Sequence, residues 1–343
     1  MIKSIQNLRG LAAFLVLLHH VAFKLERFIF NPLGWLHCAD VGVDVFFVIS
    51  GFIMCHSVRN RHGSVTAVAN FLLGRVARIL PLYWGLTTLA LIVYLLAPNL
   101  VNSSGGRTNV LASYLLFPVD AKYLVQNGWT LSYEFYFYII FSVGIALPRF
   151  IGRLGVVTLI AFLSTLGLVT GSNGIWPEFL LCPILTEFAA GIGLYVIYER
   201  SLKLTGWWSI GLIAAALATW LVVNFSGCLR SGVEDYQVRV IIYGIPAVLL
   251  CAGFIFRGTA QETGEPQKIW LWLGNISYSL YLSHPFVASA VTLILLRLPM
   301  KNFAALIAGP AMVTGSLLTA WLLYTKGELP VVSWARRYLH HRP

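Results

Sequence analysis

Long apolar runs, separated by short polar segments, fill almost the whole chain. A run of about 20 apolar residues is long enough to cross a bilayer as a helix. Ten such runs predict an all-α, polytopic membrane protein with ten transmembrane helices. Their expected limits are 7–23, 38–58, 79–98, 129–147, 154–171, 178–198, 206–224, 238–256, 269–296 and 302–324. The apolar run 109–118 is too short to span and is expected to lie at the interface or to re-enter the membrane.

Lysine and arginine residues are distributed unevenly between the two sides of these runs. If the N-terminus is inside, the inner segments hold sixteen of the 24 Lys and Arg residues and the outer segments hold eight. Cytoplasmic loops carry the excess of positive charge in membrane proteins, so both termini are expected in the cytoplasm. We therefore expect a transmembrane domain over residues 1–324 and a basic cytoplasmic tail over residues 325–343.

Composition supports the membrane assignment. Of the 343 residues, 58% are hydrophobic and 11% are charged, whereas about a quarter of the residues in soluble domains are charged. The net charge of +11 follows mostly from topology, and the basic tail is expected to meet lipid headgroups rather than nucleic acid. The five cysteines show no metal-binding spacing, so no metal is expected. Cys38 and Cys228 both fall near the expected outer face, where they could pair.

Two ionisable side chains share one face of the first expected helix. Arg9 and His20 are eleven residues apart, so their directions differ by about 20° and their axial separation is about 16 Å. The adjacent His19 points elsewhere. Arg9 alone would also fit an arginine that reaches from the helix end to the interface. Ionisable groups inside the membrane are costly and mark functional sites, and a neutral histidine is a suitable general base, so both residues are candidate catalytic residues.

Two further segments place charges at helix ends. Arg75 and Arg78 are i,i+3 neighbours at the expected cytoplasmic mouth of the third span. Two adjacent guanidinium groups suit phosphate and hence cofactor binding, although such a pair can also serve topology alone. Asp44 lies in the apolar start of the second expected helix. It should either cap that helix or need a partner, and it is a further candidate catalytic acid.

The fourth expected helix opens from the outside with a polar and aromatic segment that contains Trp129, Ser132 and Glu134. A capping role would explain Ser132 but explains Glu134 less easily. The expected depth of Glu134 is similar to that of His20, and a carboxylate beside an imidazole orients the ring and stabilises its charged form. Glu134 is therefore expected beside His20 as a catalytic residue, with Trp129 and Ser132 as candidates for substrate binding.

The ninth expected helix carries hydroxyl groups and a histidine around a proline. Pro285 is expected to kink the helix and to release backbone carbonyls. Tyr281, Ser283 and His284 lie just before this kink and are typical of a binding wall for a substrate. Hydroxyl groups also join helices to one another in membranes, and we favour that role for the two serines earlier in this helix.

These segments, in this order, resemble the acyltransferase-3 family of integral membrane acyltransferases. The matching stretches are Leu8–Ala13 with His20, Gly42–Phe52, Arg75-x-x-Arg78 with Pro81, Trp129–Glu134 and Ser277–His284. The resemblance runs from the N-terminus to residue 324. Each motif is weak alone, but together they are specific. The opening residues are most similar to the exopolysaccharide-production branch, the ExoZ-like acetyltransferases.

The resemblance implies an acyl-CoA-dependent O-acyltransferase of the bacterial inner (cytoplasmic) membrane. Such an enzyme moves an acyl group, commonly acetyl, to a hydroxyl of a surface glycan or a polyprenyl-linked glycan. Its expected partners are acetyl-CoA as co-substrate, the glycan acceptor and membrane lipids. In this family the Arg-x10-His element is taken as catalytic and falls on Arg9 and His20, whereas the Arg-x-x-Arg element falls on Arg75 and Arg78.

The expected topology agrees with such a reaction. Acyl-CoA is cytosolic and its charged nucleotide crosses a bilayer only at high cost, so Arg75 and Arg78 would hold its phosphates at the inner face. The thioester would reach His20, which would take the proton of the acceptor or briefly carry the acyl group.

Two other functions fit parts of the sequence. One is a transporter or flippase for a lipid-linked glycan, because intramembrane acids and histidines also mark proton-coupled transport. Transporters often carry paired broken helices, whereas Pro285 gives one clear break here. The other is a sensor or scaffold in polysaccharide export, which would need no phosphate site.

Overall fold

The computed structural model describes residues 2–28, 30–60, 62–101, 107–171, 174–225, 236–257, 268–299 and 301–340. Within these ranges the chain is helical, and its only extended pairings are two isolated β-bridges. The chain divides into two compact units. The first unit comprises Met1–Ile53 and Ala190–Tyr324, and the second comprises Met54–Ala189 and Thr325–Pro343.

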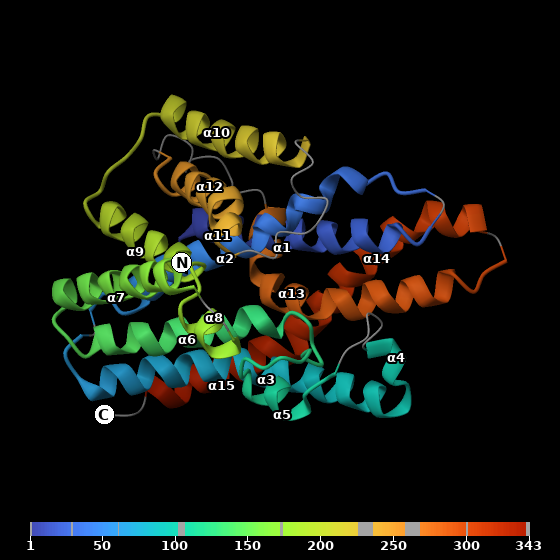
Figure 1. Ribbon diagram of the computed structural model, residues 1–343, viewed down its shortest axis with the longest axis horizontal. Coiled ribbons are helices and arrows are strands. Elements are labelled where there is room, and N and C mark those ends of the chain that lie inside the picture. Colours follow the sequence, from blue (N-terminus) through green and yellow to red (C-terminus); the bar gives the residue numbers. More distant parts are fainter. Residues whose placement is uncertain are drawn as a thin grey trace. The chain divides into compact units, whose positions relative to one another are not determined.

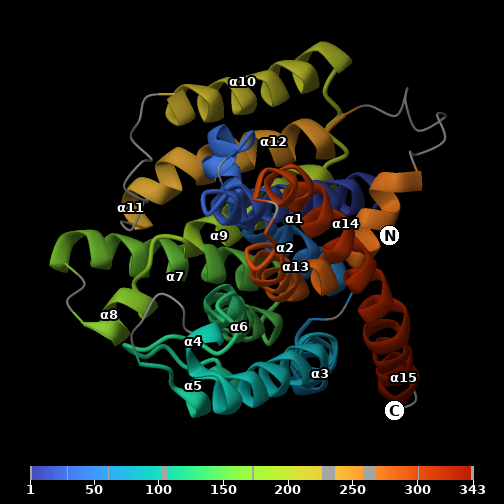
Figure 2. The same cartoon turned by 90° about the vertical axis from the view of Figure 1, so that its right-hand side faces the viewer.

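The first unit is built around two long helices that cross at small residues. Its helices are α1 (Lys3–Leu25), η1 (Gly34–Asp40), α10 (Gly206–Phe225), α11 (Tyr236–Arg239), η2 (Val240–Gly244), α12 (Ile245–Ile255), α13 (Lys268–Leu295) and α14 (Lys301–Leu323). Figure 1 shows α1 lying along α13 and α14, and buried aliphatic side chains of these three helices form one core that includes Leu17, Ile276 and Met312. Helix α10 packs over α12 (Figure 2).

Two helices pass from one unit to the other, namely α2 (Val41–Ser57) and α9 (Leu185–Glu199). Within the first unit, Gly42 at the start of α2 touches α1, because a Cβ added there would clash with the carbonyl oxygen of Ala12. In the same way, a Cβ added at Gly191 of α9 would clash with the carbonyl oxygen of Val48 on α2. Small residues let helix backbones approach closely in a membrane protein.

The second unit contains α3 (Val65–Leu96), α4 (Pro98–Val101), α5 (Val110–Leu115), α6 (Gly128–Ile145), α7 (Arg149–Thr170), α8 (Ile175–Leu180), η4 (Tyr324–Glu328), which begins at the last residue of the first unit, and α15 (Leu329–His340). Helices α6 and α7 cross at a glycine pair, Gly144 and Gly152. The Tyr83 hydroxyl of α3 donates to the Ser113 carbonyl at 2.6 Å and fixes α5 against α3. Helix α15 runs beside α3 (Figures 1 and 2).

Among the described residues, nine helical segments are long and apolar enough to cross a membrane. They correspond to nine of the ten expected spans. Helix α6, the expected span 129–147, is not among them, since Glu134 and several tyrosines lower its hydropathy. The all-helical membrane architecture is confirmed, while the count of ten and the cytoplasmic location of both termini stay predictions.

The boundaries differ from the expected ones in two places. The third span begins earlier than expected, because α3 starts at Val65 and the Ser64 side chain caps it by accepting a hydrogen bond from the Ala67 amide at 3.1 Å. Much of the predicted tail is helical, since α15 covers residues 329–340. The short run 109–118 forms only α5. The possible Cys38–Cys228 pairing lies outside what the structure describes, since it involves Cys228 and the Cys38 side chain.

Candidate active site

Helices α1 and α13 meet at a contact that requires glycine on both sides. A Cβ added at Gly10 would lie 2.9 Å from the Gly274 nitrogen and 2.9 Å from the Trp270 oxygen. A Cβ added at Gly274 would clash with the carbonyl oxygen of Gln6. The two backbones therefore touch at this point, and the side chains that follow on each helix are held at a fixed spacing.

Polar side chains join the two helices on either side of this contact. The Gln6 amide donates to Asn275 Oδ1 at 2.7 Å, and Arg9 Nη2 donates to Ser277 Oγ at 2.9 Å. Ser277 Oγ in turn donates to the Gly274 carbonyl at 2.8 Å. Ser277 thus joins helices, as favoured from the sequence. Arg9 reaches α13 through this contact.

The His20 ring also faces α13. It lies edge-on against the ring of His284, with centroids 4.7 Å apart and an interplanar angle of 74°. Arg9 and His20 therefore contact the same neighbouring helix, which confirms the shared face expected from their spacing of eleven residues. The His19 ring touches His20 at 5.1 Å between centroids. We call His19, His20 and His284 the histidine cluster.

The backbone fixes which nitrogen of each ring carries the proton. His20 Nδ1 lies 3.0 Å from the Val16 carbonyl oxygen, and His284 Nδ1 lies 2.9 Å from the Leu280 carbonyl oxygen. A carbonyl can only accept, so Nδ1 is the donor in both rings and Nε2 of the neutral ring holds a lone pair. His284 Nε2 is buried and forms no hydrogen bond within the described residues. Each neutral ring thus carries its lone pair on Nε2.

The other α13 candidates lie around the histidine cluster. Tyr281 is buried, and its ring contacts His284 at 6.3 Å and Phe46 of α2 at 5.9 Å between centroids. Ser283 donates to the Ser279 carbonyl at 2.7 Å, which is a local bond within the helix. Helix α13 continues through Pro285, which has no N–H to donate to the Tyr281 carbonyl. Substrate binding by Tyr281, Ser283 and His284 stays a prediction.

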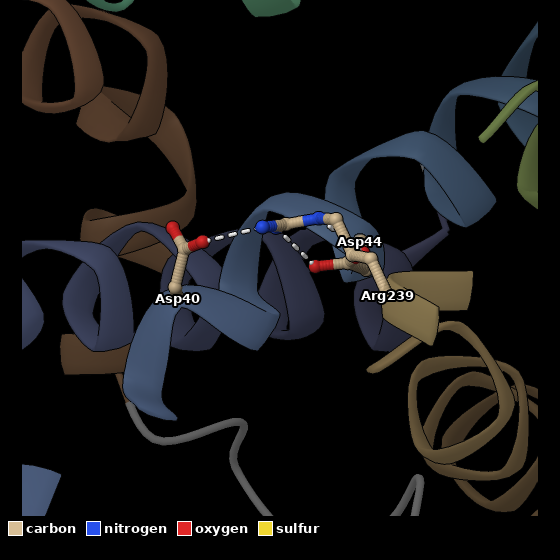
Figure 3. A network of polar contacts seen from close by, with 3 residues as sticks. All are labelled: Asp40, Asp44 and Arg239. Atoms are coloured by element: carbon tan, nitrogen blue, oxygen red, sulfur yellow. Dashed lines mark hydrogen bonds and ion pairs between the residues drawn. The ribbon is translucent and has the colours of Figure 1, made fainter. Parts of the chain in front are cut away.

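Asp44 has the buried partner that its sequence position requires. Arg239 donates to both oxygens of Asp44, from Nε at 3.1 Å and from Nη2 at 2.7 Å. Its Nη1 donates to Asp40 Oδ2 at 2.7 Å (Figure 3). The guanidinium also lies over the Tyr243 ring, 5.2 Å from its centroid. We call Asp40, Asp44 and Arg239 the acid–arginine network.

The sequence did not single out Asp40 or Arg239. Arg239 is one of the eight Lys and Arg residues assigned to the outer segments. It lies at the start of the apolar run 238–256, and this position could have indicated that it needs a buried acidic partner. The carboxylate of Asp40 interacts electrostatically with His19 and with His20. Asp40 therefore connects the acid–arginine network to the histidine cluster.

A second polar cluster lies in the second unit, on α3 and α6. The Tyr138 hydroxyl donates to Glu134 Oε1. Arg75 interacts with Tyr138 and Glu134, and Arg78 interacts with Arg75 and Tyr138. The Arg75 guanidinium also lies 5.7 Å from the centroid of the Phe71 ring. We call Arg75, Arg78, Glu134 and Tyr138 the arginine cluster.

The sequence placed Glu134 beside His20, and the contacts described here are with Tyr138 and Arg75 instead. Glu134 and His20 belong to different units, so a contact between them stays a prediction. The sequence missed Tyr138, although its spacing of four residues from Glu134 puts both on one helix face.

Ser132 and Trp129 lie at the start of α6. Ser132 Oγ does not cap the helix, because it donates to the Gly128 carbonyl at 3.2 Å and lies 3.0 Å from the Tyr123 hydroxyl. Burial raises the pKa of the Tyr123 phenol, which donates to the Phe117 carbonyl at 2.7 Å. The Trp129 ring packs edge-on against Tyr133 at 6.2 Å between centroids. Substrate binding by Trp129 and Ser132 stays a prediction.

Comparison with known proteins identifies the family. Residues 2–325 match the acyltransferase-3 family, described as an acyltransferase domain. The chain belongs to this family. It is 35% identical to the exopolysaccharide production protein ExoZ of Rhizobium meliloti (strain 1021) over 285 residues, which cover 78% of this chain and 84% of that protein. It is 26% identical to the acyltransferase MdmB of Streptomyces mycarofaciens over 314 residues, which cover 82% and 78%. No solved structure matches.

Membership of the acyltransferase-3 family confirms the resemblance drawn from the sequence motifs. The protein is an integral membrane acyltransferase, and the transporter and scaffold alternatives lose their support. All the acyltransferase motifs fall within the matched range, from Arg9 in α1 to His284 in α13. Within the described residues, no cluster of His, Cys, Asp and Glu has the arrangement of a metal site.

Proposed function

We propose that this acyltransferase moves an acyl group, commonly acetyl, from acetyl-CoA to a hydroxyl of a surface or polyprenyl-linked glycan at the bacterial inner membrane. The acceptor class is supported by the 35% identity to an exopolysaccharide production protein. The observation that carries the chemical part is the histidine cluster, in which the backbone bond of His20 Nδ1 leaves the lone pair on Nε2 of a ring that packs against His284.

His20 is proposed as the group that activates the acceptor. Its Nε2 takes the proton of the acceptor hydroxyl while the oxygen attacks the thioester carbonyl carbon. The carbon–sulfur bond then breaks, and the coenzyme A sulfur receives the proton from His20, so no net proton is consumed. The same lone pair could instead accept the acyl group and pass it on. Both routes need the tautomer that the Val16 carbonyl selects.

Arg75 and Arg78 are proposed to bind the phosphates of acetyl-CoA. They share a helix face in the arginine cluster, and a guanidinium group gives strong, charge-assisted hydrogen bonds to phosphate oxygens. Arg75 Nε is buried and forms no hydrogen bond within the described residues, so a donor remains available there. Topology requires no such buried donor, which favours phosphate binding over a purely topogenic role.

Mass spectrometry of the surface polysaccharide tests this function. Polysaccharide is compared between cells that carry the gene, cells that lack it, and deletion cells that express His20→Ala. We expect acyl groups in the first sample and their absence from the other two. Membrane levels of the variant are measured by immunoblot, because an absent protein would give the same result. An acylation pattern that is identical in all three samples would contradict the proposed function.

A further inference from the structure

Asp40 is the residue through which the acid–arginine network reaches the histidine cluster. It ends η1, which packs against α1. Arg239 binds Asp44 with two hydrogen bonds and Asp40 with one. The Asp44 side chain is fully buried, whereas that of Asp40 is 23% exposed. Arg239 thus anchors Asp40 at its place between α11 and α1.

Two carboxylates meet one guanidinium group in this network (Figure 3). Arg239 binds both oxygens of Asp44 and one oxygen of Asp40. The Asp40 carboxylate also interacts with His19 and His20, so it brings a negative charge to the histidine cluster.

The groups that interact with His20 include one lysine, two other histidines and one acid. His19 and Lys24 lie on the same helix, His284 lies on α13, and Asp40 lies on η1. A proton taken up at His20 Nε2 creates a positive charge that Lys24 repels and Asp40 attracts. Among the described groups in this set, Asp40 is the one whose charge favours the protonated ring.

We propose that Asp40, held in place by Arg239, is the carboxylate that stabilises the positive charge on His20 while that ring holds the acceptor's proton. This inference rests on the proposed function of His20. Asp40 acts as a positioning and electrostatic residue and touches no substrate. Arg239 supports this role, because its hydrogen bond to Asp40 joins the end of η1 to α11. The role beside His20 that the sequence predicts for Glu134 stays a separate prediction.

The test is the pH–rate profile of Asp40→Asn. Membranes that contain the variant and its native acceptor are supplied with radiolabelled acetyl-CoA, and label in the glycan fraction is measured. A nearby opposite charge shifts the pKa of an ionisable group by about one to three units. Because Asp40→Asn removes such a charge from His20, we expect kcat to fall about tenfold or more. The acid limb should move about one pH unit downward. The KM for acetyl-CoA should stay at its parental value, and Asp40→Glu should restore the parental limb.

An asparagine variant away from the network serves as the control. Asp120→Asn removes an exposed acid of the second unit and should leave rate and profile unchanged. A parental rate and limb in Asp40→Asn, or an equal shift of the limb in Asp120→Asn, would overturn the proposal.

The level of each variant in the membrane decides between a structural and an electrostatic role. If Asp40→Asn is absent from the membrane, Asp40→Ser is measured in its place. Absence of both would assign Asp40 a purely structural role and overturn the proposal. His20→Ala is measured in parallel to separate the two hypotheses. If His20→Ala transfers label normally, the proposed function of His20 is wrong. If it is inactive while Asp40→Asn behaves as the parent, only the inference about Asp40 fails.

Discussion

The acid–arginine network beside the histidine cluster in the first unit and the arginine cluster in the second unit combine charges in opposite proportions. Beside the histidines, the two carboxylates of Asp40 and Asp44 face a single arginine. In the arginine cluster, Arg75 interacts with the Glu134 carboxylate, and both Arg75 and Arg78 interact with Tyr138. A negative excess stabilises a proton on an imidazole, whereas a positive excess attracts an anion.

The two clusters also differ in how their side chains are fixed. His20 and His284 are each bound to a carbonyl of their own helix, so ring orientation is set locally. Arg75 interacts instead with Tyr138 and Glu134 on a different helix. A locally fixed base suits a reaction that needs one tautomer, while long arginine side chains suit the binding of a charged, extended co-substrate. The proposed function accordingly assigns proton transfer to the first unit and donor binding to the second.

The largest expected effect is that of His20→Ala. Transfer should fall by about a hundredfold or more, because the general base is removed. His19→Ala should retain much of the activity, since His19 lies off the face that contacts α13. Label transfer is measured at equal membrane levels of the two proteins. Equal losses in both variants would show that helical phase does not select the reactive histidine.

Gly274→Ala should have the second-largest effect on activity, because the added methyl group would push α1 and α13 apart. The new Cβ would clash with the Gln6 carbonyl, and overpacking of this kind costs about 1–3 kcal/mol. Gly74→Ala on α3 is the matched control, since a Cβ there meets no atom within 4 Å. Thermal unfolding in detergent and label transfer are both measured. We expect losses in Gly274→Ala alone, and a stable, active Gly274→Ala would show that the crossing does not position the histidine cluster.

The kinetic defect of Glu134→Gln distinguishes the role of the arginine cluster from that of the histidine cluster. The variant should lose most activity with little loss of fold, because the carboxylate that holds Tyr138 and interacts with Arg75 is removed. The defect should appear in the KM for acetyl-CoA. A downward shift of the acid limb, as expected for Asp40→Asn, would instead place Glu134 in service of His20 and break the comparison.

Arg75→Ala and Arg78→Ala should have the smallest effect of this series. Each loses a charge-assisted phosphate contact, which is worth about 1.5–3 kcal/mol, so the KM for acetyl-CoA should rise about tenfold or more. Lysine at either position should restore only part of the affinity, because it lacks the planar fork of arginine. Steady-state rates at varied acetyl-CoA give these values, and an unchanged KM would assign the pair to topology.

The sequence predicted local relations better than distant ones. The common face of Arg9 and His20 follows from helix periodicity within one element, and the structure confirms it through contacts with α13. The need of Asp44 for a partner follows from burial. That partner, Arg239, lies 195 residues away, and no periodicity connects the two. The contact of His20 with His284 was hidden for the same reason, because it depends on the glycine crossing of two helices.

Motif spacing did not single out Asp40 as an acid near His20. Depth along a helix placed Glu134 and His20 at similar levels, and a contact between them stays a prediction because the two residues belong to different units. Asp40 escaped notice because it precedes the motif Gly42–Phe52 and lies in a 3-10 segment, where helical phase gives no guidance. The family, in contrast, follows from five short motifs in order, since their combination is far more specific than any one contact.

The most direct test of this division of labour is a titration with acetyl-CoA of membranes that contain either His20→Ala or Arg78→Ala at matched protein levels. The account predicts that saturating acetyl-CoA restores most of the parental rate in Arg78→Ala and none in His20→Ala, because one variant has lost donor affinity and the other has lost the base. Recovery of His20→Ala at high acetyl-CoA, together with an Arg78→Ala rate that stays low, would contradict the assignment of both clusters.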